Sequence, residues 1–416
     1  MANRKITEQK KRLWNAHGIK TFLSYGFRPF FLAAGIYAML PMFAWLVWIG
    51  VHAAGGLVIN MTIAEPPHIW HGHEMVYGFA SAAVAGFLLT AVPNWTGTQP
   101  FRGASLGILF AIWISGRAAM WFSAYLPTLL VAILDAAFLL SLLIVLTRQL
   151  ALRPVAKNIV FAGFIGLLFA GNLVYHLDRL NVIDDGAPRA LHLGLLTLVL
   201  MITVIGGRVV PAFTRNSLKY RGPDIALPKS FPILDGLSIG TVLAYLILAT
   251  AEAGSAILGA TAISAAITNG LRLSFWRSKA TFREPIVWVL HLGYGWLVLG
   301  FLLLGLAHFF DILNTIAARH ALATGAVGTM MMAIMTRAAL GHTGRALVAP
   351  RPIALAYLLI SLTALLRAIG PSLAPRFYNE LMFAAGVSWI IAFAIFVIIF
   401  APILLGPRLP RQASSA

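Results

Sequence analysis

The sequence contains no cysteine and few charged residues, and each shortage narrows the possible classes of protein. Without cysteine the chain forms neither a disulfide framework nor a thiolate metal site. Any metal must therefore be held by nitrogen, oxygen or methionine sulfur. Charged residues make up 11% of the 416 residues, about half the usual share of a soluble domain. Nucleotide-binding loops and hydrolase motifs are also missing, so hydrolysis and nucleotide-driven transport are unsupported.

What the chain does have is hydrophobic residues, 60% of the total, with a mean hydropathy of +0.85. Twelve apolar runs are each long enough to cross about 30 Å of hydrocarbon. We therefore predict an all-α, polytopic membrane helix bundle of about 12 transmembrane helices. The runs are residues 29–49, 73–93, 104–124, 127–147, 157–177, 190–211, 232–251, 253–271, 285–307, 318–340, 353–370 and 380–405.

The net charge of +18 lies between the apolar runs, so it indicates membrane topology rather than a nucleic-acid partner. Basic residues cluster before the first run and after the fourth, sixth and eighth runs, whereas the opposite loops are acidic. By the positive-inside rule both termini are cytoplasmic, which requires an even number of helices. We expect a cytoplasmic and interfacial segment at 1–28, one transmembrane bundle at 29–405 and a cytoplasmic tail at 406–416.

A weak internal repeat organises these helices. Three long helices end in a similar way near Thr96, Thr214 and Thr343, and counting back one helix length, ~34 Å, reaches a histidine each time. We predict three four-helix repeats of the same orientation, at residues 22–153, 154–280 and 281–410. Parallel repeats of this kind often place a site at their mutual interface. The three matched histidines are His73, His192 and His320.

Most histidines then fall near the outer, periplasmic boundary of the membrane. A single histidine in a membrane span is usually satisfied by an interhelical hydrogen bond. Several at one depth on different helices favour metal or haem ligation, because neutral imidazole is the commonest metal ligand. The members of this outer layer are His52, His68, His71, His73, His176, His192, His308 and His320.

The richest motif in the layer is the segment 70–75 (WHGHEM). His71 and His73 are two residues apart and point to different sides of a regular helix, so they share no ion unless Gly72 breaks the helix. His71 shares a face with Glu74, and His73 shares one with Tyr77. One interpretation is metal ligation by one histidine, with proton handling by Glu74 or Tyr77. The alternative is a polar helix cap at the membrane interface.

A few polar residues lie towards the inner face instead. Arg208 and Arg337 occupy matching points of the second and third repeats, where they either snorkel to the interface or pair with haem propionates. His291 and His342 form a second, inner site or hold helices together. The methionines at 330–332 and 335 are expected to pack rather than to bind copper.

Several long motifs resemble the NnrS family over nearly the whole chain. They include residues 27–31 (FRPFF), 71–75 (HGHEM), 86–97 (GFLLTAVPNWTG), 206–216 (GGRVVPAFTRN) and 336–345 (TRAALGHTGR). The resemblance implies a bacterial inner-membrane protein that contains haem b and copper and takes part in nitric oxide metabolism under nitrosative stress. It supplies no ligand assignment, so each candidate residue depends on spacing.

Three functional hypotheses follow. The first is an oxidoreductase that reduces nitric oxide to nitrous oxide at a haem and copper site held by outer histidines, with a quinol or a periplasmic cytochrome as electron donor. The second is a secondary transporter, because about twelve helices in repeats describe many carriers. The third is a haem-carrying accessory or sensor protein without turnover.

Overall fold

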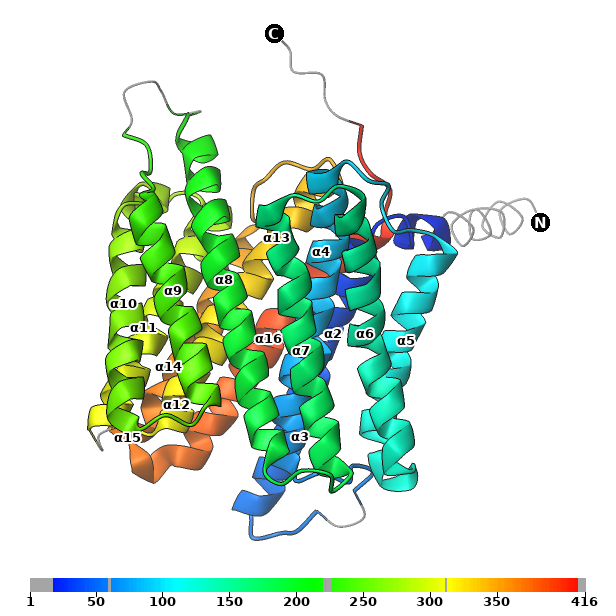
Figure 1. Cartoon of the computed structure of the whole chain (residues 1–416), viewed down its shortest axis with the longest axis vertical. Coiled ribbons are helices and arrows are strands. Elements are labelled where there is room, and N and C mark those ends of the chain that lie inside the picture. Colours follow the sequence, from blue (N-terminus) through cyan, green and yellow to red (C-terminus); the bar gives the residue numbers. More distant parts are fainter. Residues whose placement is uncertain (1–17, 59–60, 220, 222–225, 311–312, 411–416) are drawn as a thin grey trace, which may run out of the picture.

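The computed structural model describes residues 18–58, 61–219, 221, 226–310 and 313–410, so most of the expected N-terminal segment and the end of the tail lie outside it. The described residues form one bundle with twelve helices that are long and apolar enough to cross a membrane (Figure 1). Each predicted run coincides with one of them, and the predicted all-α polytopic bundle is confirmed. The first six spans are Phe27–Ala53 (α2), Pro67–Thr96 (α3, Pro67–His73; η1, Glu74–Ala80; α4, Ser81–Thr96), Ala104–Trp121 (α5), Thr128–Leu152 (α6), Ala156–Arg179 (α7) and Gly186–Lys219 (α8).

The remaining spans complete the bundle, and four short elements lie in the connections. The spans are Pro232–Thr250 (α9), Ser255–Ser274 (α10), Pro285–Phe309 (α11), Thr315–His342 (α12, Thr315–His320; η4, Ala321–Gly328; α13, Thr329–His342), Arg351–Ala368 (α14) and Tyr378–Leu405 (α16). The short elements are η2 (Ser123–Tyr125), η3 (Ser278–Thr281), α15 (Gly370–Leu373) and η5 (Pro375–Phe377).

Some helices are longer than the predicted apolar runs, because they continue beyond the hydrocarbon core of the membrane. Pro67 opens α3 six residues before the predicted start, since proline at the first helical turn has no hydrogen bond to lose. The 34 residues of α8 span ~51 Å, far more than the membrane core requires. Hydropathy detects only the part of a helix that lies in lipid.

The first and the last described residues of the chain lie at the same end of the molecule (Figure 1). Arg28, at the start of α2, donates through Nη1 to the carbonyls of Leu404 and Gly406 at 2.6 and 2.7 Å. The backbone N–H of Leu409 donates to the carbonyl of Thr343 at 2.9 Å. An even number of spans places the two ends of the chain on the same side of the membrane, and these contacts agree with that arrangement. The α3 and α12 helices lie at the opposite end.

The most buried spans are the second helix of each predicted repeat, Pro67–Thr96, Gly186–Lys219 and Thr315–His342. Two of these contain π-helical turns, η1 directly after His73 and η4 directly after His320. The predicted repeat places those two histidines at equivalent positions. π-helical turns are frequent at functional sites. The helix α8 continues through His192 as a regular α-helix. The threefold repeat itself stays a prediction, and these turns make the second helices the place to look for a site.

A buried arginine ties α8, α9, α10 and α11 together. Arg272 of α10 donates through Nε to Asp235 at 2.6 Å, and through Nη1 to the carbonyl of Thr203 at 2.9 Å and the hydroxyl of Tyr294 at 3.1 Å. Gly207 of α8 faces this guanidinium so closely that a Cβ there would overlap it. Glycine is therefore required at this position for a close approach.

Gly207→Ala is expected to destabilise the protein by roughly 1–3 kcal/mol, because the guanidinium of Arg272 must give up buried hydrogen bonds. The control is Gly163→Ala on α7, where an added Cβ meets nothing within 4 Å. That change should stabilise the helix by up to about 1 kcal/mol. Thermal unfolding of the detergent-solubilised variants measures both effects, and equal melting temperatures would contradict the close contact.

Candidate metal centre

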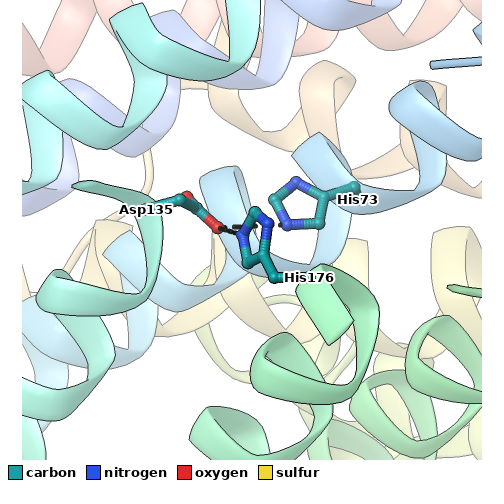
Figure 2. A group of neighbouring side chains, drawn as sticks. All are labelled: His73, Asp135 and His176. Atoms are coloured by element: carbon teal, nitrogen blue, oxygen red, sulfur yellow. Dashed lines mark hydrogen bonds and ion pairs between the residues drawn. The ribbon is translucent and has the colours of Figure 1, made fainter. Parts of the chain in front are cut away.

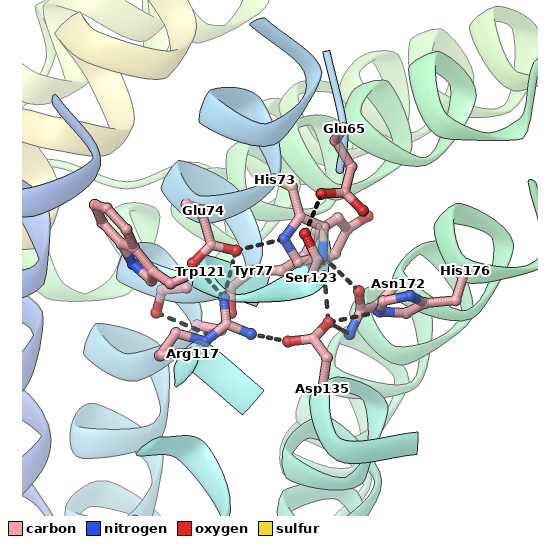
Figure 3. Close-up of polar contacts among 12 residues, drawn as sticks. Glu65, His73, Glu74, Tyr77, Arg117, Trp121, Ser123, Asp135, Asn172 and His176 are labelled. Atoms are coloured by element: carbon pink, nitrogen blue, oxygen red, sulfur yellow. Dashed lines mark hydrogen bonds and ion pairs between the residues drawn. The ribbon is translucent and has the colours of Figure 1, made fainter. Parts of the chain in front are cut away.

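Six polar side chains from five elements meet beside α3 (Figure 3), which lies at the end of the bundle away from the chain ends (Figure 1). Each is at least 94% buried, among lipid-spanning helices. Ionisable residues are costly there and usually mark a functional site. We call this group the buried charge cluster. Its members are His73 of α3, Glu74 of η1, Arg117 of α5, Asp135 of α6, and Asn172 and His176 of α7.

Arg117 joins the two carboxylates of the cluster. Its Nη1 donates to both oxygens of Glu74, at 2.7 and 2.8 Å, and its Nη2 forms an ion pair with Asp135. The hydroxyl of Tyr37 also donates to Glu74, and Trp121 Nε1 donates to that hydroxyl at 2.9 Å. Glu74 is thereby held by two donor side chains, Arg117 and Tyr37.

His73 is surrounded by hydrogen-bond acceptors. Its Nδ1 lies 2.7 Å from Glu74 Oε1. Its Nε2 lies 2.9 Å from Asn172 Oδ1 and 3.2 Å from Asp135 Oδ2. Because Asn172 Nδ2 donates to Asp135 at 2.9 Å, the amide oxygen must be the atom that faces His73. When Nδ1–H donates to Glu74, the lone pair of Nε2 is available to a metal ion.

The charges of the cluster also favour a bound cation. One positive group, Arg117, faces two negative groups, Glu74 and Asp135, which leaves a net charge of −1. An uncompensated buried charge is expensive in a medium of low dielectric constant. A bound cation would balance that charge.

Three members are placed to hold that metal (Figure 2). His73, Asp135 and His176 each offer one ligand atom, and these atoms all lie within 4.8 Å of one another. His176 Nε2 is 2.8 Å from Asp135 Oδ2. Two imidazoles and a carboxylate suit copper, zinc or iron. A carboxylate that accepts the other ring N–H, as Glu74 does for His73, is the usual partner of a metal-binding histidine. The donor set therefore fits a metal.

Tyr77 lies beside the cluster without joining its charges. Its ring centroid is 5.1 Å from that of His73, as their shared face predicted. Its hydroxyl donates to the carbonyl of Ala190 on α8 at 2.5 Å. This hydrogen bond holds the phenol against α8, at the contact between two central helices.

His71 points away from the cluster and stacks on Trp45 of α2, with ring centroids 5.1 Å apart. Its Nδ1 is buried and has no hydrogen-bond partner among the described residues, whereas the other ring nitrogen donates to the backbone carbonyl of Pro41. A ligating histidine commonly donates its other ring N–H to a carbonyl. His71 is therefore a candidate ligand separate from the cluster. His71 and Glu74, which were predicted to share a face, have different partners: His71 stacks on Trp45, and Glu74 accepts from Arg117.

Two further histidines of the outer layer, His320 and His192, lie apart from the buried charge cluster. His320 Nδ1 lies 2.7 Å from the carbonyl of Ile316, one turn earlier in the same span. His192 has a buried Nε2 without a hydrogen-bond partner among the described residues.

His308 itself is engaged by neighbouring helices. Its Nδ1 lies 3.1 Å from the hydroxyl of Ser255, and its Nε2 lies 3.4 Å from that of Tyr245. These contacts tie α11 to α9 and α10. The structure therefore brings His73 and His176 together and places His71, His192, His308 and His320 elsewhere.

At the inner end, the structure gives His291 and His342 different partners. His291 uses both ring nitrogens, towards Thr214 at 2.8 Å and Ser278 at 2.9 Å, so it holds α8, α11 and η3 together. The ring of His342 packs against Phe27.

The two inner arginines also lie apart from the buried charge cluster. Arg337 stacks over the ring of Phe213 at 3.8 Å. Arg208 is exposed and lines a cavity of about 630 Å³.

The site residues predicted from the sequence did not include Arg117, Asp135 or Asn172. Each is an isolated polar residue inside an apolar run, at 104–124, 127–147 and 157–177. A charged or amide side chain in such a run is a functional candidate by default. This signal was present without any knowledge of the fold.

The fold and the buried charge cluster define a multi-pass membrane protein with a buried site of histidine and carboxylate side chains. The family model described as NnrS protein matches residues 21–408, nearly the whole chain. The chain therefore belongs to the NnrS family, a family linked to metal and haem binding. A comparison with curated proteins returned no match.

Proposed function

We propose that this chain is a bacterial inner-membrane protein of nitric oxide metabolism that holds copper at His73, Asp135 and His176 and haem b through outer histidines. Family membership supports the class of activity, and the negative net charge of the buried charge cluster supports the cation. In this proposal the protein relieves nitrosative stress by reducing nitric oxide to nitrous oxide. That cluster is the observation that carries the proposal.

The orientation follows from charge. The first and the last described residues lie at the same end of the molecule as the α8–α9 connection (Figure 1), and the residues that flank this connection include the basic Arg215, Lys219, Arg221 and Lys229. The positive-inside rule assigns that end to the cytoplasm. The buried charge cluster at the other end then lies near the periplasmic face, within reach of a periplasmic cytochrome or a quinol as electron donor.

The haem would be held by histidines whose ring nitrogens lack protein partners. His71 Nδ1 and His192 Nε2 meet this condition among the described residues. Haem and copper, when bound, supply redox-active metals at which nitric oxide binds and electrons are transferred. Arg208 and Arg337 remain candidates for pairing with the propionates.

The side chains of the buried charge cluster would position the ligands and supply protons. Joining two molecules of nitric oxide to nitrous oxide consumes two electrons and two protons and releases one water. Glu74 contacts the hydroxyl of Tyr37 and the ring of His73, so it connects two proton-bearing groups. Tyr77 lies against His73 and completes that side of the site.

The purified protein is expected to contain copper by elemental analysis and to show a Soret band that shifts when nitric oxide is added. His176→Ala should lose most of the copper, because it removes one of three ligand atoms, whereas the matched His68→Ala, at an exposed histidine, should keep it. Protein without copper and without a Soret band would contradict the proposal.

Turnover separates an enzyme from an accessory or sensor protein. Nitric oxide consumption by the isolated protein with a chemical electron donor supports the oxidoreductase, and binding without consumption supports the sensor. A secondary transporter is the alternative, and uptake of a labelled solute by proteoliposomes that contain the haem-free protein would favour it.

A further inference from the structure

A small cavity lies where the central helices meet. Its volume is about 60 Å³, and its walls come from α4, α8, α11 and α13. Every lining residue is nonpolar, and the cavity touches all three spans that the predicted repeat equates. The residues are Ala83, Val84, Phe87, Leu198, Met201, Ile202, Ile205, Gly206, Val209, Val210, Leu290, Met330, Met331, Ile334 and Met335.

The size and the lining of this central cavity determine what it can hold. A water molecule needs a cavity volume of about 10–15 Å³ and two to four polar partners. The central cavity is large enough for water but offers no polar side chain, so water gains nothing by entering. Dry cavities of this chemistry bind small nonpolar molecules such as xenon.

The central cavity lies close to the buried charge cluster. Ala83 and Val84 follow Tyr77 by six and seven residues on the same helix, or about 10 Å. On α8, Gly194 packs against Tyr77, and Leu198 of the cavity wall is one turn further along. Tyr77 therefore stands between the cavity and His73.

At its other side the central cavity adjoins a larger one. Ile205 and Val209 of α8 line both it and the cavity of about 630 Å³ that contains Arg208. Trp95 and Phe161 form part of that larger wall. The order along α4 and α8 is thus a large, partly polar cavity, the small nonpolar cavity, Tyr77 and the buried charge cluster.

We propose that the central cavity is a binding site for a small nonpolar gas on its route to the buried charge cluster. The identity of the gas as nitric oxide rests on the proposed function above, since a weakly polar diatomic molecule matches this volume and lining. The capacity to bind a nonpolar gas depends only on the cavity.

Xenon tests the site directly. Crystals of the full-length protein under xenon pressure should show xenon between α4, α8 and α13. Val84→Phe fills the cavity and should reduce xenon occupancy at least tenfold. The matched control Val47→Phe lies on α2 at a side chain that is 46% exposed, and it should keep the wild-type occupancy. Ile334→Phe fills the same cavity from α13 if Val84→Phe does not fold.

Absence of xenon from the wild-type cavity would overturn the proposal, as would a lipid tail in it or full occupancy in both filled variants. Xenon binding requires neither copper nor haem. A protein that binds xenon but no metal would refute the proposed function and leave the gas site standing. A protein that binds metal but no xenon would do the reverse.

Discussion

Arg117→Met is expected to destabilise the protein by about 3–5 kcal/mol, the usual cost of leaving a buried charge without its partner. Glu74 and Asp135 would both remain in the bundle interior, and neither has another arginine or lysine in the buried charge cluster. Unfolding in mixed micelles with a metal chelator present measures the effect, so that no added cation replaces the guanidinium.

The control for this change is Arg189→Met. Arg189 pairs with Glu252 at 2.7 Å, but both side chains are more than half exposed. Pairs of that kind contribute about 0–1 kcal/mol. Equal stability of the two variants would show that the buried charge cluster does not need the charge of Arg117, and the charge count behind the proposed metal site would then be wrong.

The bundle was predictable because lipid imposes a simple rule. Helices that cross hydrocarbon must be long and apolar, so α6 and α16 were visible as long apolar runs, in spite of Asp135 within α6. The π-helical turns η1 and η4 were not predicted, because the apolar pattern of their sequences, 74–80 and 321–328, indicates a helix but does not distinguish a π-helical turn from an α-helical one.

The candidate site was only half visible in the sequence. Spacing selected His73, Glu74 and His176, since each lies at a helix end in the histidine-rich layer. Their association with Asp135 depends on α6 packing against α7, a contact that no local pattern records. Spacing also grouped His192 and His308 with these residues. Equal depth in the membrane does not bring side chains together when they face different neighbours.

Glu74→Gln is expected to weaken copper binding by about 10–100-fold, the usual effect of losing the carboxylate behind a metal-binding histidine. The amide keeps the size of the side chain but removes the negative charge that faces His73 Nδ1 at 2.7 Å. His73 then becomes a weaker ligand, and the buried charge cluster loses the excess charge that favours a cation. Competition against a copper chelator of known affinity measures the change.

Two comparisons separate this effect from simple loss of structure. Glu252→Gln removes a carboxylate that is 63% exposed and should leave the copper affinity unchanged. Glu74→Asp restores the charge on a side chain that is one methylene shorter, so it should recover part of the lost affinity. An unchanged affinity in Glu74→Gln would mean that Glu74 serves only to neutralise Arg117, and His73 would then bind copper without help from its neighbour.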